Sequence, residues 1–376
     1  MIAINALATR AGGAAVRVSE VARRAPALWG ARILLLRNEG VGIEVEPGPA
    51  RLVSGWPRPL AASPALPRRV FEAAVVRRRC RGLPIRALLH YGTYVPLRPP
   101  PDVLNVLCFI SLAPWDPGPA AGRPRNRLLR ALFERSRARV DLIVVQSQAT
   151  RDFLAQRYPD IAGRLAVVIN GLAVPALVRP AHPRGFLLLG DVHEYRRIDD
   201  VIRAYARLDP ALRAAHPLTI AGHAGRDPAA LRRIDEAVHT HGLSGLVRRP
   251  GLVSRARALE LMAEAAAFVS YATIENGPNA LREARAAGTP LILSDLAVHR
   301  EFGGAQATYV GNGAALAQAL GEAAAAADAR SVAEPRAAVD TWDEHVGRLG
   351  ALLAAHGVIV GIERPGRSLE PDVPAR

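Results

Sequence analysis

The chain has 376 residues, half of them hydrophobic, so it can build two domains of ordinary size, each with its own core. No apolar run reaches the roughly 18 to 20 residues that span a bilayer, which argues against a membrane-spanning helix. The net charge is +15, but all 49 basic residues are arginines scattered along the chain, and only 5% of residues are aromatic. This pattern favours a composition bias over a nucleic-acid-binding surface, and we expect no nucleic-acid partner.

The two cysteines give no sign of a disulfide framework or a metal site. Cys80 and Cys108 lack the spacings that these sites use, and Cys108 lies in an apolar run. We therefore predict a reducing, cytoplasmic location and no bound metal.

The first half of the sequence alternates apolar runs with helical patterns. It begins with IAINAL, which we interpret as a strand that leads into the loop RAGGAA, rather than as part of an Arg-rich transit peptide. Further strands are predicted at ARILLLR, VLNVLCFISL, LIVVQS and LAVVIN. Residues 50–101 are less regular and rich in proline and arginine, and we expect surface loops there.

A dense basic cluster lies in that Pro- and Arg-rich segment. It comprises Arg77, Arg78, Arg79 and Arg81 in the stretch VVRRRCRGLPIR. Such a cluster could lie against anionic lipid or an anionic acceptor, as in a peripheral membrane protein at the inner face of the membrane. The alternative is an ordinary solvated face, which is the more common role of such a run.

From about residue 180 onward, strand and helix patterns alternate regularly. The strands are GFLLLGD, PLTIAG, VRRPGLV, AFVSYA, LILSD and ATYVG, and amphipathic helices separate most of them. This alternation predicts a parallel sheet covered by helices on both faces. In such sheets ligands bind at the carboxyl ends of strands, so the loops at Gly190, His223, 250–253 and 274–279 are expected to converge on one cleft.

Four segments follow from these patterns. We predict an N-terminal Rossmann-like domain over 1–175, a C-terminal one over 176–340, with a linker within 170–185, and a C-terminal helix over 341–360. The tail, residues 361–376, has the composition of a disordered segment. The predicted fold class is α/β with two domains facing a central cleft.

The stretch IENGPNALREARAAGTPLILSD, residues 274–295, carries two glutamates eight positions apart. Its turn residues predict a helix that begins near Asn279, with Asn279 as its cap, and ends at Gly288. Glu275 then lies in the loop before the helix and Glu283 lies within it, at the margin of its apolar face. Arg282 is expected to point away from that face.

The N-terminus of this helix can bind a phosphate, because its first backbone N–H groups are free and its dipole favours negative charge. Carboxylates beside an anion are better suited to hydroxyl groups on the same ligand, and a nucleotide sugar has that layout. The alternative reading is that Glu275 is a turn residue and Glu283 a solvated residue paired with a nearby arginine.

Three further stretches, in order, make the chain similar to retaining glycosyltransferases of the GT-B fold, in family 4. VDLIVVQSQATRDFLAQRYPDIAGRLAVVINGL resembles the end of the family's first domain, and LLLGDVHEYRRIDDVIRAYARL resembles the start of its second. AAFVSYATIENGPNALREARAAGTPLILSDLAVHRE resembles the family signature, with Glu275 and Glu283 at its two glutamates.

The resemblance implies that the C-terminal helix, residues 341–360, packs back toward the N-terminal domain. It also implies roles for individual residues. Glu275 would contact the transferred sugar and Glu283 the ribose, while Arg196 would neutralise the diphosphate, with Arg197 as a less favoured substitute. The remaining nucleotide-sugar site would comprise Gly190, His223 and the loop and helix start formed by Gly277, Pro278, Asn279 and Ala280. The acceptor side is assigned to Gly12, Gly13 and Ser111, and His193 and His299 are candidate sugar or acceptor contacts.

Two residues depart from the family pattern. Asp191 stands where a second arginine is common. Many family members also have a histidine at the end of a first-domain strand, whereas the end of the stretch VLNVLCFISL has Ser111 and no histidine. The departures leave a non-enzymatic alternative open, a degenerate scaffold in a polysaccharide-assembly complex.

The resemblance implies transfer of a hexose such as mannose, glucose or rhamnose from a nucleoside-diphosphate sugar to a saccharide or lipid-linked hydroxyl acceptor, with retention and without metal or cofactor. Bacterial polysaccharide or glycolipid assembly is the expected setting. A related epimerase is a further alternative, whereas a phosphorylase would need a cofactor-binding lysine that this chain lacks.

Overall fold

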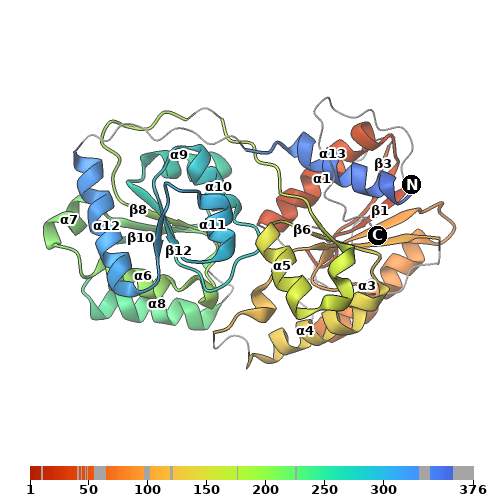
Figure 1. Ribbon diagram of the computed structural model, residues 1–376, viewed down its shortest axis with the longest axis horizontal. Helices are drawn as coiled ribbons and strands as arrows, with labels where there is room; N and C mark the ends of the chain where they lie inside the picture. Colours follow the sequence, from red (N-terminus) through yellow and green to blue (C-terminus); the bar gives the residue numbers. More distant parts are fainter. Residues whose placement is uncertain are drawn as a thin grey trace.

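The computed structural model describes residues 1–9, 12–39, 42–43, 45–46, 48, 50–54, 65–96, 102–118, 122–175, 177–224, 227–329 and 339–358. These residues form two α/β domains that lie side by side, the first at the right and the second at the left of Figure 1. Among them, no helix has both the length and the hydropathy that crossing a membrane requires.

The sheet of the first domain has seven parallel strands in the order β3-β2-β1-β4-β5-β6-β7. Helices α1 and α13 pack on one face of this sheet, and α3, α4 and α5 on the other. The strands are β1 (Ile2–Asn5), β2 (Ile33–Leu36), β3 (Arg51–Ser54), β4 (Ala87–Gly92), β5 (Leu104–Phe109), β6 (Leu142–Val145) and β7 (Leu165–Val167). The helices and short turns are α1 (Gly13–Trp29), α3 (Ala65–Cys80), η1 (Ala113–Trp115), α4 (Pro124–Ser136), η3 (Arg137–Arg139), α5 (Gln148–Arg157), η4 (Pro159–Arg164) and α13 (Trp342–Ala355).

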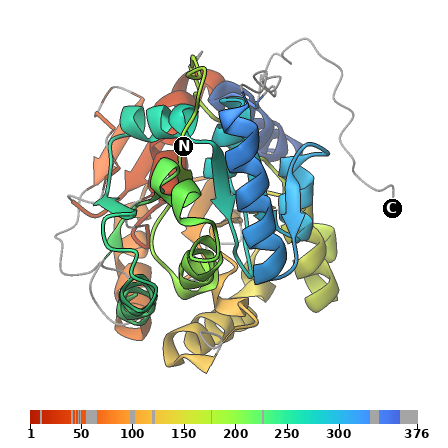
Figure 2. The same ribbon diagram turned by 90° about the vertical axis from the view of Figure 1, so that its left-hand side faces the viewer.

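The second domain has a six-stranded parallel sheet in the order β10-β9-β8-β11-β12-β13. Helices α6, α8 and α12 cover one face and α9, α10 and α11 the other, and Figure 2 shows this domain from its outer side. The strands are β8 (Phe186–Leu189), β9 (Leu218–Ala221), β10 (Val247–Gly251), β11 (Ala267–Ser270), β12 (Leu291–Ser294) and β13 (Thr308–Val310). The helices and one turn are η5 (Glu194–Arg196), α6 (Ile198–Tyr205), α7 (Pro210–Ala215), α8 (Pro228–Thr240), α9 (Arg255–Glu264), α10 (Asn279–Ala286), α11 (Ala297–Gly303) and α12 (Gly313–Asp328).

The strands are almost continuous apolar runs, such as ILLL in β2 and LIVV in β6, and their residues are buried. This is the pattern of a parallel sheet that helices cover on both faces, because neither face meets water. The strand order reverses between β1 and β4 in the first sheet and between β8 and β11 in the second. Loops beyond the carboxyl ends of these strands are the usual ligand-binding positions of such sheets.

The described part of residues 50–101 is more regular than the sequence analysis expected. It contains β3, α3 and the six-residue β4, whose residues are all buried between β1 and β5. A histidine inside the strand obscured its apolar character. His90 is accommodated because its Nδ1 lies 2.9 Å from Asn5 Nδ2, and burial lowers the pKa of His90 to about 3, so the ring stays neutral.

The loop predicted after β1 is shorter than RAGGAA, because α1 begins at Gly13. After the second domain the chain returns to the first, where α13 packs on α1. Trp29 Nε1 donates to the Val346 carbonyl oxygen at 2.9 Å, and Val346 and Leu349 are buried in the first domain's core. The predicted tail, 361–376, lies outside the described residues.

Gly171 lies where the outgoing and returning chain segments meet. A Cβ atom at this position would lie 2.4 Å from the backbone N and Cα of Trp342, and Leu172 N donates to the Asp340 carbonyl oxygen at 2.8 Å. Two backbones therefore approach each other more closely than any side chain at 171 allows.

We expect Gly171→Ala to lower the free energy of unfolding by roughly 1 to 3 kcal/mol, because the backbone of α13 must shift to admit the methyl group. Denaturant midpoints measure this. Gly347→Ala is the matched control, since a Cβ there meets open space and alanine favours a helix interior by up to about 1 kcal/mol. Equal midpoints for the two variants would contradict the close approach.

Candidate active site

A cavity of about 470 Å³ lies between the two domains. Its first-domain wall follows β1, β5 and β6 and includes Gly12, Ile110 and Gln146, and its second-domain wall follows β8, β10 and β11. The volume is in the range of small-molecule sites. Because strand ends from both sheets meet here, including those next to both reversals of strand order, this cavity is the candidate active site.

Arg196 is the cation that the loop after β8 brings into the cavity. Its guanidinium lies against the backbone of Gly190, where a Cβ atom would be 2.9 Å from Arg196 Cζ and where φ is 134°, a value that favours glycine. Within the described chain, Arg196 Nε is buried and has no hydrogen-bond partner. The cation that is expected to meet a diphosphate thus lies at the cavity with an unused donor.

The electrostatic surroundings of Arg196 favour its charged form. Burial alone lowers the pKa of the guanidinium, but Tyr195, Glu275 and Asp191 act in the other direction, and the net pKa lies above its usual value. Tyr195 also stacks on His193, with ring centroids 5.3 Å apart, and both residues line the cavity.

Glu275 lies in the loop between β11 and α10, as predicted from the sequence, and lines the cavity. Its Oε1 accepts a hydrogen bond from Asn276 N at 2.9 Å. His299, close enough to interact with Glu275 electrostatically, is fully buried, and burial lowers its pKa. The neutral ring lies with Nδ1 2.9 Å from the Ser294 carbonyl oxygen. The ring thus contacts Ser270 and Ser294, at the carboxyl ends of β11 and β12, and His299 is not among the residues that line the cavity.

The N-terminus of α10 also faces the cavity, which Pro278, Asn279 and Ala280 line. The prediction that Asn279 caps this helix is wrong, because Pro278 occupies the cap position and Asn279 is the first helical residue. Asn279 N donates to the Gly277 carbonyl oxygen at 3.0 Å, and its Oδ1 accepts from Asn170 Nδ2 at 3.2 Å. The amide of Ala280 belongs to the first turn, whose N–H groups have no acceptor within the helix.

Glu283 lies in α10, and its side chain is 10% exposed at the cavity wall. Arg255, from the first turn of α9, pairs with it: Nη1 lies 2.8 Å from Glu283 Oε1, while Nη2 donates to the Ala173 carbonyl oxygen at 2.9 Å. The pairing of Glu283 with an arginine, one of the two sequence-based alternatives, is thus present, but it occurs inside the cavity. A ligand with hydroxyl groups would compete with Arg255 for this carboxylate.

Arg282, which was expected to point away from the apolar face of α10, is nevertheless not exposed to solvent. It is buried between α10 and the segment that joins the domains, where Nη1 donates to the Asn170 carbonyl oxygen at 2.6 Å and Nη2 lies 3.1 Å from Asp340 Oδ2. The helical periodicity of α10 alone could not predict these contacts, because the chain segments at Asn170 and Asp340 that join the two domains are distant in sequence. Arg282 thereby connects the helix that carries Glu283 to both interdomain crossings.

The structure brings most of the predicted residues together at the cavity. Those that line it are Gly12, Gly13, Gly190, Arg196, Glu275, Gly277, Pro278, Asn279, Ala280 and Glu283, and Asp191 lines it as well.

Three predicted residues are not among the lining residues. Arg197 instead donates from Nε to Asp200 Oδ2 at 2.6 Å, and its Cζ lies 4.6 Å from the centre of the Tyr271 ring. Ser111 Oγ accepts from Ala113 N at 3.1 Å, which is a turn contact. His223 follows the lining residue Gly222. The geometry favours Arg196 over Arg197.

Several lining residues were not identified from the sequence. Leu252 lies in the loop after β10 and is 77% exposed, and Arg255 is the first residue of α9, which follows that loop. The signal for Leu252 was present, because residues 250–253 were one of the predicted strand-end loops. Gln146 and Trp342 gave no comparable signal, since their place depends on how the two domains meet.

Among the described residues, no group of three or more His, Cys, Asp or Glu side chains is arranged to hold a metal ion.

Residues 175–332 match the family described as Glycosyl transferases group 1. This stretch includes all of the second sheet and the residues Arg196, Glu275 and Glu283. No curated protein matches the sequence at a significant level. The second domain is therefore a glycosyl transferases group 1 domain.

Solved structures resemble the whole chain. Sucrose-phosphate synthase from Thermosynechococcus elongatus has a TM-score of 0.70 at 17% identity, covering 95% of this chain and 98% of its own. WaaG, a glycosyltransferase involved in lipopolysaccharide biosynthesis, has a TM-score of 0.68 at 16% identity, covering 96% and 100%. Anabaena HepE in complex with UDP and glucose has a TM-score of 0.64 at 14% identity, covering 94% and 99%. The predicted fold class, GT-B with two Rossmann-like domains, is confirmed.

Proposed function

We propose that this protein is a retaining, metal-independent glycosyltransferase that moves a hexose from a nucleoside-diphosphate sugar to a hydroxyl group of a saccharide or lipid-linked acceptor. One observation carries the proposal. Arg196, Glu275, Glu283 and the N-terminus of α10 line a single cavity, and all belong to the domain that matches Glycosyl transferases group 1.

The cavity offers one partner for each part of such a donor. The Arg196 guanidinium and the first-turn amide of Ala280 suit the diphosphate, because both present N–H donors and positive charge. Glu283 would accept hydrogen bonds from the ribose hydroxyls, displacing Arg255, and Glu275 would accept from hydroxyls of the transferred sugar. The wall with Gly12 and Gly13 then lies on the acceptor side.

The proposed reaction breaks the bond between the anomeric carbon and the diphosphate oxygen. Negative charge grows on that oxygen, and Arg196 and the α10 N-terminus are placed to stabilise it. The acceptor hydroxyl attacks from the same face and its proton passes to the leaving phosphate oxygen, so configuration is retained and no protein nucleophile is needed. Glu275 and Glu283 serve as hydrogen-bond acceptors in this scheme.

The structural neighbours support the choice of substrates. HepE was solved with UDP and glucose, and WaaG is involved in lipopolysaccharide biosynthesis. By analogy we propose a hexose donor, such as mannose, glucose or rhamnose, and a role in polysaccharide or glycolipid assembly at the cytoplasmic side of a membrane.

Peripheral contact with an anionic membrane is part of the same proposal. Arg77, Arg78 and Arg79 lie in the last turn of α3, and they and Arg81 are exposed. Val70, on the same helix, is 67% exposed. A basic surface with an exposed apolar residue is suited to a lipid headgroup region.

The proposal is tested by a thermal-shift screen of nucleoside diphosphates and their sugars, followed by turnover assays with the donor that binds. A ligand at about 100 times its dissociation constant stabilises the folded state by roughly 2.7 kcal/mol. We expect a nucleoside diphosphate to raise the melting temperature and its sugar to be consumed. Stabilisation without turnover would favour the scaffold alternative, for which Asp191 in the cavity wall is the structural argument, and no stabilisation would refute a donor site.

We expect turnover to persist in EDTA. Arg196 and the α10 N-terminus supply the positive charge that a divalent ion gives in metal-dependent enzymes. Initial rates before and after chelation measure this, with a metal-dependent transferase as the assay control. Complete loss of turnover in EDTA that manganese or magnesium restores would contradict the prediction.

A further inference from the structure

The turn η5 ends at Arg196, and its position fixes where that guanidinium enters the cavity. The turn has only three residues, Glu194–Arg196, and Arg197 after it has a φ of 49°, outside regular helix geometry. Such a short turn has few backbone hydrogen bonds of its own. Side-chain contacts on its flanks must therefore hold it.

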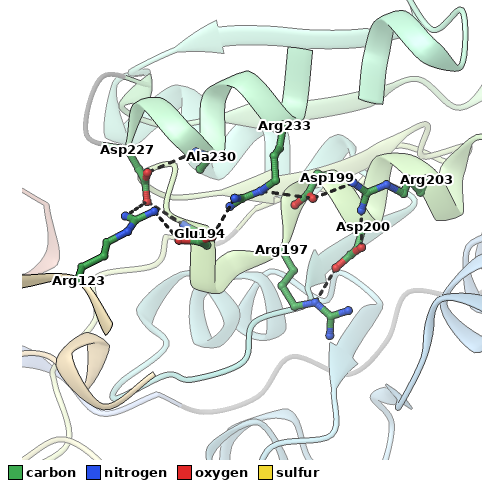
Figure 3. A network of polar contacts seen from close by, with 9 residues as sticks. All are labelled: Arg123, Glu194, Arg197, Asp199, Asp200, Arg203, Asp227, Ala230 and Arg233. Carbon is green, nitrogen blue, oxygen red and sulfur yellow. Dashed lines mark hydrogen bonds and ion pairs between the residues drawn. The ribbon is translucent and has the colours of Figure 1, made fainter. Parts of the chain in front are cut away.

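One of these contacts comes from the first domain. Arg123, the residue before α4, reaches across to the second domain, where Nη2 lies 2.5 Å from Glu194 Oε2 and Nη1 lies 3.0 Å from Asp227 Oδ2 (Figure 3). Asp227 Oδ2 also accepts from Glu194 N at 3.2 Å. One first-domain guanidinium thus binds both the side chain of the turn and the carboxylate that holds its backbone.

The second domain reinforces the same carboxylates. Arg233 of α8 lies 2.8 Å from Glu194 Oε1, and Figure 3 shows the chain of ion pairs continuing through Asp199, Arg203 and Asp200 to Arg197. The side chains of Glu194 and Asp227 are only 12% and 7% exposed, whereas Arg123 is 40% exposed. Loss of Arg123 would leave two largely buried carboxylates one cation short.

A second first-domain residue holds the other side of the turn. Thr273 N donates to the Tyr195 carbonyl oxygen at 2.8 Å, and the Thr273 hydroxyl donates to Asp116 Oδ1 at 2.5 Å. Asp116 is 2% exposed and follows η1, seven positions before Arg123 in the sequence. Thr273 lies two residues before Glu275. Asp116 and Arg123 therefore contact both segments that carry the proposed catalytic groups.

We propose that Arg123 is a positioning residue, which sets Arg196 in the cavity through Glu194 and Asp227 only when the two domains are closed on each other. This inference rests on the proposed function for its catalytic consequence. Donor chemistry would then depend on closure, because the turn that carries the diphosphate-binding cation is fixed by the domain opposite.

The main variant is Arg123→Ala, and Arg127→Ala is its matched control. Arg127 is an exposed arginine in α4, four residues after Arg123. We expect Arg123→Ala to lower the single-turnover rate about 10-fold, the effect of about 1.4 kcal/mol, from two partly exposed ion pairs. The affinity for nucleoside diphosphate should change less, since Glu283 is untouched. Arg123→Lys should recover part of the rate, because a lysine supplies the charge without the two-pronged geometry.

Two further measurements separate positioning from general stability. In a double-mutant cycle, the single-turnover rate of the variant with both Arg123→Ala and Glu194→Gln should fall far less than the product of the two single effects. The reason is that both substitutions remove the same contact between Arg123 and Glu194. Small-angle X-ray scattering should show a larger radius of gyration for Arg123→Ala than for Arg127→Ala. The scattering comparison needs no activity.

The inference is overturned if Arg123→Ala matches Arg127→Ala in both single-turnover rate and scattering, or if the double-mutant effects are simply additive. If the wild-type protein turns over no nucleotide sugar, the proposed function fails, and scattering alone decides the inference. Expansion in Arg123→Ala would then support Arg123 as the residue that holds the domains together, and an unchanged profile would refute it.

Discussion

Arg196→Ala is expected to lower the single-turnover rate by about 100- to 1000-fold, the usual effect of losing one preorganised contact to a developing anion. Its guanidinium lies at the cavity with Nε unused in the described structure. The diphosphate becomes more negative as the glycosidic bond breaks, so the lost contact is worth more in the transition state than in the ground state. Donor affinity should therefore fall much less than the rate.

Single-turnover kinetics and donor titrations on matched variants measure this. Arg197→Ala is the control, because the Arg197 guanidinium forms an ion pair with Asp200 and lies over the Tyr271 ring. Asp191→Arg adds a cation to the cavity wall and should leave donor binding unchanged or tighten it. An inactive Arg197→Ala beside a normal Arg196→Ala would show that the assignment is wrong by one residue. If neither variant matters, the diphosphate binds elsewhere.

Glu275→Gln and Glu283→Gln are expected to impair different properties of the protein, turnover in the first case and nucleotide binding in the second. Glu275 is assigned to the transferred sugar, so Glu275→Gln should chiefly lower turnover while nucleoside diphosphate still binds. Glu283 is assigned to the ribose, so Glu283→Gln should weaken binding of the nucleoside diphosphate itself. The substitution keeps the size of each side chain and removes its charge, and hydrogen bonds to charged groups are typically worth about 1.5 to 3 kcal/mol.

Titration with nucleoside diphosphate and single-turnover rates separate the two effects. Arg255→Ala is the additional control, because it removes the ion pair with Glu283 but leaves the carboxylate. Equal loss of nucleotide affinity in Glu275→Gln and Glu283→Gln would contradict the assignment. If Arg255→Ala weakens binding as much as Glu283→Gln, the ion pair and not the ribose contact determines affinity.

Local patterns were enough to predict the second domain and its loops. The apolar run GFLLLGD, which forms β8, is followed by an amphipathic helix pattern. The turn residues of IENGPN predict the start of α10 to within a residue. The two glutamates could be placed because one lies in a short loop and the other a turn into the helix. These features depend on neighbours in sequence, which is why they could be predicted.

What failed depends on partners distant in sequence. β4 is stabilised by β1 and β5 on its two sides and carries a buried histidine whose Nδ1 is paired with Asn5, 85 positions away. The burial of Arg282 was not predicted, because it depends on the carbonyl oxygen of Asn170 and the carboxylate of Asp340, which only the fold brings beside it. The bridge from Arg123 to Glu194 spans 71 positions and leaves no periodic signal in the chain.

The return of α13 to the first domain has an evolutionary consequence. In the chain topology, the whole second domain is an insertion between β7 and α13 of the first domain, and the two points of insertion are in contact, since Leu172 N donates to the Asp340 carbonyl oxygen. A recombination event with both breakpoints there could exchange one second domain for another while the core of the first domain, which includes Val346 and Leu349, stays whole. A single breakpoint could not, because it would separate the host from the helix that completes it.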